Sequence, residues 1–196
     1  INKVWLTILK GNIYALAMIM LISLFSALVA AGAFIKIPMI PVPMTLQTLF
    51  VFLAALLLPS LSSFSSILIY IVLGAIGLPI FTSGGGLSAL LGPTGGFIFG
   101  FLAAAPLGSF LAEKKRDSIL WNVVVLLAME VIIYFIGIIW LKVKLDATWA
   151  KAFAVGLTPF IIGDAVKIAC ASICGKLLYP ETLKLRAKLS RREKDE

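Results

Sequence analysis

Long apolar runs without a charged residue dominate this chain. The first run, from Asn12 to Phe34, has 23 residues and no charge, and a helix needs about 20 apolar residues to cross the hydrocarbon layer of a membrane. The 76 residues from Ile37 to Ala112 contain no Asp, Glu, Lys, Arg or His. No soluble domain of this size needs so much unbroken apolar chain for its core, so the pattern predicts an integral membrane protein.

Proline and glycine clusters divide these runs into six predicted helices. Pro38, Pro41 and Pro43 end the first run, Pro59 with a serine-rich turn ends the second, and Pro79 ends the third, because proline lacks the N–H that a helix interior needs. We expect membrane spans over residues 12–34, 45–60, 64–78, 94–112, 119–141 and 153–178. The predicted fold is an all-α bundle in one compact domain, residues 1–196, with the charged tail after Pro180 as a short surface helix or a frayed end.

Composition and charge support this prediction and orient the chain. The sequence is 61% hydrophobic and 13% charged, with a net charge of +8, which excludes a soluble enzyme, a nucleic-acid binder and a disordered protein. If the N-terminus lies in the cytoplasm, twelve of the seventeen Lys and Arg residues fall inside and four outside, with Lys167 in a span. Because short cytoplasmic loops are enriched in Lys and Arg, we expect both termini in the cytoplasm.

Several other sites are not expected. The chain has no histidine, and its two cysteines, Cys170 and Cys174, lie four residues apart in one apolar run, so we expect neither a metal site nor a disulfide. The N-terminus shows no separate pattern of a removable signal peptide.

Small residues recur every four positions in two predicted spans. In the fourth span they are Gly92, Gly96, Gly100, Ala104 and Gly108, a spacing that lets a neighbouring helix approach closely. We expect this stripe to pack within the bundle.

The first span carries a similar face. It contains Ser23, Ala27 and Ala31, with Ala30 and Ala33 beside them. This face is suited either to packing within the bundle or to docking a separate membrane protein, and the sequence alone leaves both open.

Apart from Lys176 near the cytoplasmic end of the last span, three charged residues lie inside the predicted spans, where each is costly unless it is paired or hydrated. Asp164 and Lys167 are three positions apart and therefore share one helix face. They form either a self-neutralising pair or a binding site for a small ligand with N–H donors and a carbonyl acceptor. Glu130 is suited to pair with Lys167, to carry a proton or to face a partner protein.

Two loops supply further polar groups. Gly92 to Gly96 lead into a helix whose free N–H groups suit a carboxylate, and the proline-rich segment leads to Thr45 and Gln47. The segment GPTGG is not a nucleotide-phosphate loop, because no Lys follows in the required pattern. Turn geometry alone would also explain both segments.

Several motifs in order along the chain resemble the BioY family. They are IKIP at 35–38, PVPMTLQTL at 41–49, LGAIGLPIF at 73–81, GGG at 84–86, LGPTGG at 91–96 and PFIIGDAVK at 159–167. The family consists of biotin-binding S components of energy-coupling factor transporters with six membrane helices. The resemblance therefore implies high-affinity capture of biotin at the extracellular side of the plasma membrane of a prokaryote by a multi-pass protein.

The resemblance also implies roles for individual residues. Asp164 would accept a hydrogen bond from a ureido N–H of biotin, and Lys167 would donate to the ureido carbonyl or orient Asp164. Phe97 stands where many members carry Tyr, so its ring has no hydroxyl to offer. The expected ligand-binding residues are Thr45, Gln47, Phe81, Gly85, Gly86, Leu87, Thr94, Gly95, Gly96, Phe97, Asp164 and Lys167.

Partners follow from the same resemblance, because the chain carries no ATPase motif. It implies a transmembrane coupling subunit, docked on the face with Ala27, Ala30 and Ala31, and two cytoplasmic ATPase subunits that use ATP. We expect no cofactor and no catalysis. Two alternatives remain open: an S component for another vitamin of the thiamine or riboflavin type, and an intramembrane enzyme that uses Asp164 or Glu130.

Overall fold

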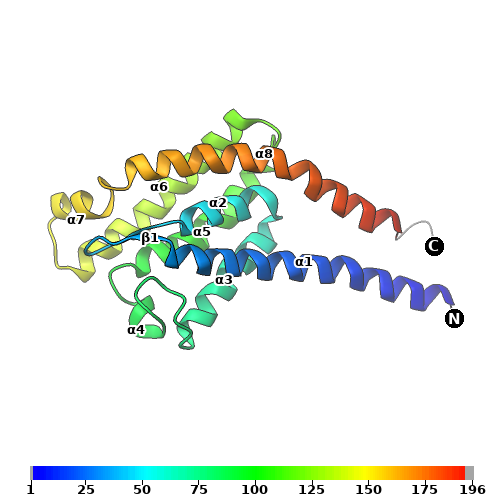
Figure 1. Ribbon diagram of the computed structural model, residues 1–196, viewed down its shortest axis with the longest axis horizontal. Coiled ribbons are helices and arrows are strands. Elements are labelled where there is room, and N and C mark those ends of the chain that lie inside the picture. The colour runs from blue at the N-terminus through cyan, green and yellow to red at the C-terminus, as the bar shows by residue number, and fades with distance from the viewer. Residues whose placement is uncertain (1, 193–196) are drawn as a thin grey trace.

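The computed structural model describes residues 2–192, and it describes the side chains of residues 15–180 and of Thr182. It is mostly helical (Figure 1). Its elements are α1 (Asn2–Phe34), β1 (Lys36–Ile37), β2 (Met44–Thr45), α2 (Gln47–Leu57), α3 (Ser60–Ala75), α4 (Leu87–Leu90), α5 (Gly95–Ala112), α6 (Ile119–Lys144), α7 (Trp149–Gly156) and α8 (Ile161–Arg192).

The helices follow the predicted spans, but they differ in length. Among the described residues, three segments are long and apolar enough to cross a membrane: Ala15–Phe34, Gly95–Ala112 and Ile119–Leu145. The bent pair of α7 and α8 makes a fourth if it is one span. Helices α2 and α3 are shorter, and α2 extends only about 16 Å at 1.5 Å per residue.

The single helix predicted over residues 153–178 is wrong. The chain breaks between α7 and α8, and the two helices are bent by 48°. Pro159 lies in this break, where it removes a backbone donor and disfavours helical geometry at Thr158. The break places Phe160 and the first turn of α8 at the wall of a cavity described below.

Three further segments differ from the expectation. α8 continues through Pro180 to Arg192, so the described part of the tail is neither a separate surface helix nor a frayed end. The proline-rich segment contains a short antiparallel pair, in which Lys36 faces Thr45 and Ile37 faces Met44. The glycine-rich stretch contains the one-turn helix α4.

The centre of the bundle is built around α2. Val51, Phe52, Ala54 and Ala55 have no exposed surface, and Leu56 is 1% exposed. Because its neighbours surround it, a short helix at this position does not have to match the thickness of the lipid layer.

The glycine stripe of the fourth predicted span packs against α6, as expected. A Cβ at Gly100 would lie 2.9 Å from the Cα of Ile133, and one at Gly96 would lie 2.2 Å from the Cβ of Trp140. Gly92 precedes α5 and contributes its carbonyl, which accepts a hydrogen bond of 2.9 Å from the indole of Trp140.

Three long connecting segments collect at one end of the molecule. Segments 36–46, 76–94 and 145–160 lie toward the left of Figure 1, and we call this the loop end. The first turns of α1 and the last turns of α8 extend to the opposite end. Of the basic residues predicted to be cytoplasmic, Lys194 lies outside the described residues, and the side chains of Lys3, Lys10, Lys184, Arg186, Lys188, Arg191 and Arg192 are not described.

Candidate functional site

A pocket lies between the loop end and the bundle interior. About 530 Å³ of its space is free of protein atoms, counting the part open to solvent. Its lining comes from segments far apart in the sequence: Val42, Pro43, Thr45, Gln47, Thr48, Thr82, Thr94, Phe97, Ile98, Phe101, Glu130, Ile133, Tyr134, Phe160, Asp164 and Lys167.

The predicted Asp164–Lys167 pair forms one side of this pocket. Lys167 Nζ donates to Asp164 Oδ1 at 2.9 Å, and Asp164 is 5% and Lys167 7% exposed. Asp164 lies in the first turn of α8, where the partial positive charge of the helix N-terminus favours a carboxylate. The pair is thus mutually bonded, and it also borders a cavity.

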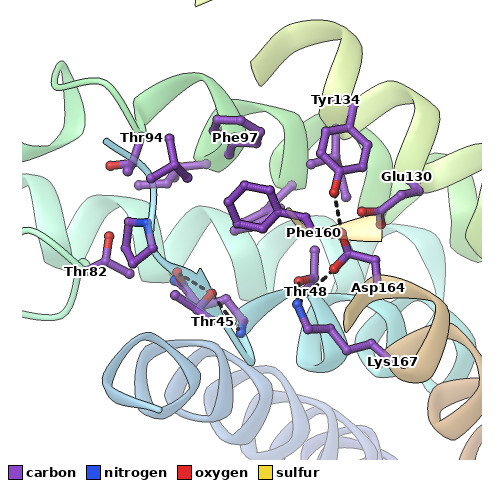
Figure 2. A pocket seen from close by; sticks show the side chains of 16 residues that line it. Thr45, Thr48, Thr82, Thr94, Phe97, Glu130, Tyr134, Phe160, Asp164 and Lys167 are labelled. Carbon is purple, nitrogen blue, oxygen red and sulfur yellow. Dashed lines mark hydrogen bonds and ion pairs between the residues drawn. The ribbon is translucent and has the colours of Figure 1, made fainter. Parts of the chain in front are cut away.

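Two side chains that the sequence analysis did not select complete the bonds of the pair. The hydroxyl of Tyr134 donates to Asp164 Oδ2 (Figure 2), and Lys167 Nζ also bonds to Thr48 Oγ1 at 3.1 Å. Tyr134 lies one helical turn after Glu130, so both residues are on the same face of α6. A polar aromatic one turn from an intramembrane carboxyl was the signal available in the sequence.

Apolar and aromatic side chains form the middle of the pocket. Phe97 of α5 meets Tyr134 edge to face, with ring centroids 6.3 Å apart, and Figure 2 shows Phe160 between this pair and Thr48. Ile98 and Phe101 continue the wall on α5. Of these residues only Phe97 is among the predicted ligand-binding residues, and the structure places it in the pocket lining.

Hydroxyl and amide groups from the loop end form the other side. Thr45 and Thr94, both predicted, line the pocket, and the buried Oγ1 of Thr94 has no hydrogen-bond partner among the described residues. Gln47 also lines it, and its amide Nε2 donates to Tyr70 at 2.6 Å. Figure 2 shows Thr82 and Thr94 on the side away from Asp164 and Lys167.

Six predicted residues do not line the pocket, and close packing explains three of them. Phe81 is 2% exposed and packs edge to face on Tyr70, with ring centroids 5.3 Å apart. A Cβ at Gly95 would lie 1.9 Å from the carbonyl oxygen of Leu90, and Gly96 lies against Trp140. These residues fix the packing of the loop end behind the pocket wall.

The other three of the six belong to the glycine-rich stretch. A Cβ at Gly85 would lie 2.4 Å from the carbonyl oxygen of Leu78, and Gly86 has a φ of 89°. Leu87 begins α4 and is 62% exposed. The two glycines are required by the backbone path, since only glycine adopts such a φ or fits such a contact without strain.

The small-residue face of α1 lies on the outside of the bundle. Ser23, Ala27 and Ala31 are exposed, Ala30 is half-buried, and Ala33 is buried. The described part of the chain therefore leaves the outer edge of this face uncovered.

Comparison with known proteins agrees with the arrangement described above. The sequence model of the BioY family matches residues 7–183. The chain belongs to the BioY family. The matched range includes every residue that lines the pocket.

Individual BioY relatives are similar over most of their length. The chain is 36% identical to "Probable biotin transporter BioY" of Lysinibacillus sphaericus over 90% of this chain and 94% of the relative. It is 42% identical to "Probable biotin transporter BioY" of Pyrococcus horikoshii, over 83% and 96%. It is 41% identical to "Biotin transporter BioY" of Thermotoga maritima, over 76% and 88%.

A solved structure has the same fold. The S-component for biotin from an ECF-type ABC transporter, a crystal structure, superposes with a TM-score of 0.78 and 27% identity. The match covers 85% of this chain and 93% of that one. The present chain therefore has the S-component fold.

Proposed function

We propose that this protein captures biotin with high affinity at the loop end and supports its uptake as the S component of an energy-coupling factor transporter. The observation that carries the proposal is the buried Asp164–Lys167 pair at the wall of a largely apolar pocket. Membership of the BioY family and the similarity to biotin transporters support the choice of ligand.

The distribution of polar groups in the pocket suits the parts of biotin. The ureido ring offers two N–H donors and one carbonyl acceptor, which match the carboxylate of Asp164 and the ammonium of Lys167. The sulfur ring and the aliphatic chain suit the wall of Phe97, Phe160 and Ile98. The carboxylate would then lie near Thr94 and Thr45, whose hydroxyls can donate to it.

The proposed membrane arrangement has six spans in one domain. They are α1, α2, α3, α5, α6 and the bent pair of α7 and α8. The α5–α6 connection, with Lys114, Lys115 and Arg116, lies at the end of α5 away from the loop end. Because cytoplasmic loops are enriched in Lys and Arg, the loop end would face outward and both termini the cytoplasm of a prokaryotic cell. This places the pocket on the outer side of the plasma membrane.

Transport would depend on other subunits, since the chain carries no nucleotide-phosphate motif. We expect a transmembrane coupling subunit on the exposed face with Ala27 and Ala31, and two cytoplasmic ATPases that use ATP. The chain itself would bind and release biotin without catalysis or a cofactor of its own.

Calorimetric titration of the purified, detergent-solubilised protein with biotin tests this proposal. We expect Asp164→Asn to weaken biotin binding about tenfold or more, because a hydrogen bond from a ureido N–H to a charged carboxylate contributes about 1.5–3 kcal/mol. Asp117→Asn makes the same chemical change at an exposed residue of the α5–α6 connection and should bind as the unaltered protein does. Absence of biotin binding, or tighter binding of thiamine or riboflavin, would overturn the proposal.

A further inference from the structure

Glu130 is a buried carboxyl group in the pocket with no role in the account above. It lies on α6, is 8% exposed and belongs to the pocket lining. Its Oε2 atom is buried and has no hydrogen-bond partner among the described residues. Figure 2 shows its carboxyl group beside Asp164 and Tyr134.

The neighbouring donors are already engaged with other acceptors. The one proton of the Tyr134 hydroxyl points to Asp164 Oδ2. The ammonium of Lys167 bonds to Asp164 Oδ1 and to Thr48 Oγ1. Both oxygens of Asp164 therefore accept hydrogen bonds from the protein, whereas Glu130 keeps an acceptor atom, Oε2, that no described residue uses.

The free oxygen of Glu130 is unfavourable for the fold. A buried acceptor without a donor destabilises the folded protein, and an apolar side chain of similar size would avoid that penalty. Glu130 also does not serve as the bonded partner of Lys167, since Asp164 fills that role. A donor supplied by a ligand in the pocket would satisfy the free oxygen.

We propose that Glu130 contacts the ligand directly and accepts a hydrogen bond from one ring N–H, while Asp164 faces the other. Two acceptors on two helices, α6 and α8, would then make the pocket selective for a ring that presents two N–H donors. This inference rests on the proposed function, because the cyclic urea of biotin is such a ring.

The test compares biotin with two cyclic carbamate analogues, in each of which one ring N–H is replaced by oxygen. These analogues keep the size of the ring and remove one donor each. The unaltered protein should bind biotin about tenfold or more tightly than either analogue, as expected for a hydrogen bond to a carboxyl group. In Glu130→Leu the preference for biotin over one of the two analogues should fall to about one, while the preference over the other remains.

The ratio of two affinities within one variant does not depend on the fraction of protein that is folded. If Glu130→Leu does not fold, Glu130→Met provides a second apolar side chain, and the same loss of preference is expected. Glu130→Gln keeps a side-chain oxygen acceptor and should retain both preferences. Glu113→Leu alters an exposed glutamate outside the pocket and should leave both ratios unchanged.

The outcomes separate the two proposals. If the unaltered protein binds biotin, and both ratios persist in Glu130→Leu or Glu130→Met, Glu130 does not accept a ring N–H and the inference is overturned. A loss of both preferences in Glu130→Gln would also overturn it. Failure of the unaltered protein to bind biotin would instead contradict the proposed function.

Discussion

Two helices of this protein carry the same pattern of small residues and use it in opposite ways. On α5, Gly96, Gly100, Ala104 and Gly108 are buried, and α6 packs directly on the three glycines. On α1, Ser23, Ala27 and Ala31 repeat at the same spacing and are exposed. The comparison shows that the pattern permits a close approach of a neighbouring helix, and does not determine whether the chain itself supplies that neighbour.

The largest expected effect comes from filling the buried stripe. Gly100→Leu should prevent correct packing of α5 on α6, because even a Cβ would lie 2.9 Å from the Cα of Ile133. We expect a loss of about 3 kcal/mol or more in the free energy of unfolding, measured as lost thermal stability and lost monodisperse protein in detergent. Ala27→Leu on the exposed stripe is the matched control and should leave stability unchanged. Equal damage by both substitutions would remove the distinction between the two faces.

The second effect tests whether the exposed small-residue face of α1 docks another membrane protein. Ala27→Trp and Ala31→Trp should lower biotin uptake by cells with the complete transporter about tenfold or more, equal to about 1.4 kcal/mol of lost docking free energy. Biotin binding to the isolated protein should not change, because neither alanine lines the pocket. Both effects are measured with radiolabelled biotin.

Leu120→Trp provides the control for the second prediction. Leu120 is 76% exposed on α6, away from the stripe of α1, and the same bulky side chain there should leave uptake intact. Docking on α1 would be contradicted if all three variants lost uptake equally, or if the alanine variants lost biotin binding.

The smallest effect distinguishes positions within the buried stripe. A Cβ at Gly108 would meet the flexible side chain of Met129, whereas one at Gly96 would meet the Cβ of Trp140 at 2.2 Å and the carbonyl oxygen of Ile136 at 3.1 Å. Gly108→Ala should therefore cost only about 1 kcal/mol, and Gly96→Ala about 2 kcal/mol or more. Thermal unfolding of the two variants side by side measures the order, and the reverse order would show that Met129 is the more rigid neighbour.

Charge in an apolar run was the most informative signal for the site. Asp164 and Lys167 were identified because charged residues in a membrane span are costly and therefore need a reason, and the structure places them together in the pocket wall. Thr48, Tyr134 and Phe160 carry no charge, and the one signal for Tyr134 was its position one turn after Glu130. They become pocket residues only because α2, α6 and the break before α8 converge at one place.

Glycine in the loops was a weaker signal, for a physical reason. Gly85, Gly95 and Gly96 fit either a backbone that approaches a ligand or a backbone that approaches another part of the chain. The structure shows the second arrangement, with Leu78, Leu90 and Trp140 as the close neighbours. No pattern of residue types separates the two, because the steric requirement for glycine is the same.

The sequence by itself determined that the chain is a bundle of apolar helices, where most of those helices lie and which buried charges demand a partner. These properties follow from the free-energy cost of placing charges and unpaired backbone groups in an apolar medium. That cost can be assigned to each residue from its type and its position in the sequence. Tertiary structure alone decided that α2 is enclosed, that one small-residue face is covered and the other exposed, and that Glu130 joins Asp164 at one wall. Those outcomes depend on which helix surfaces meet, and contacts between distant segments are not encoded in any local pattern.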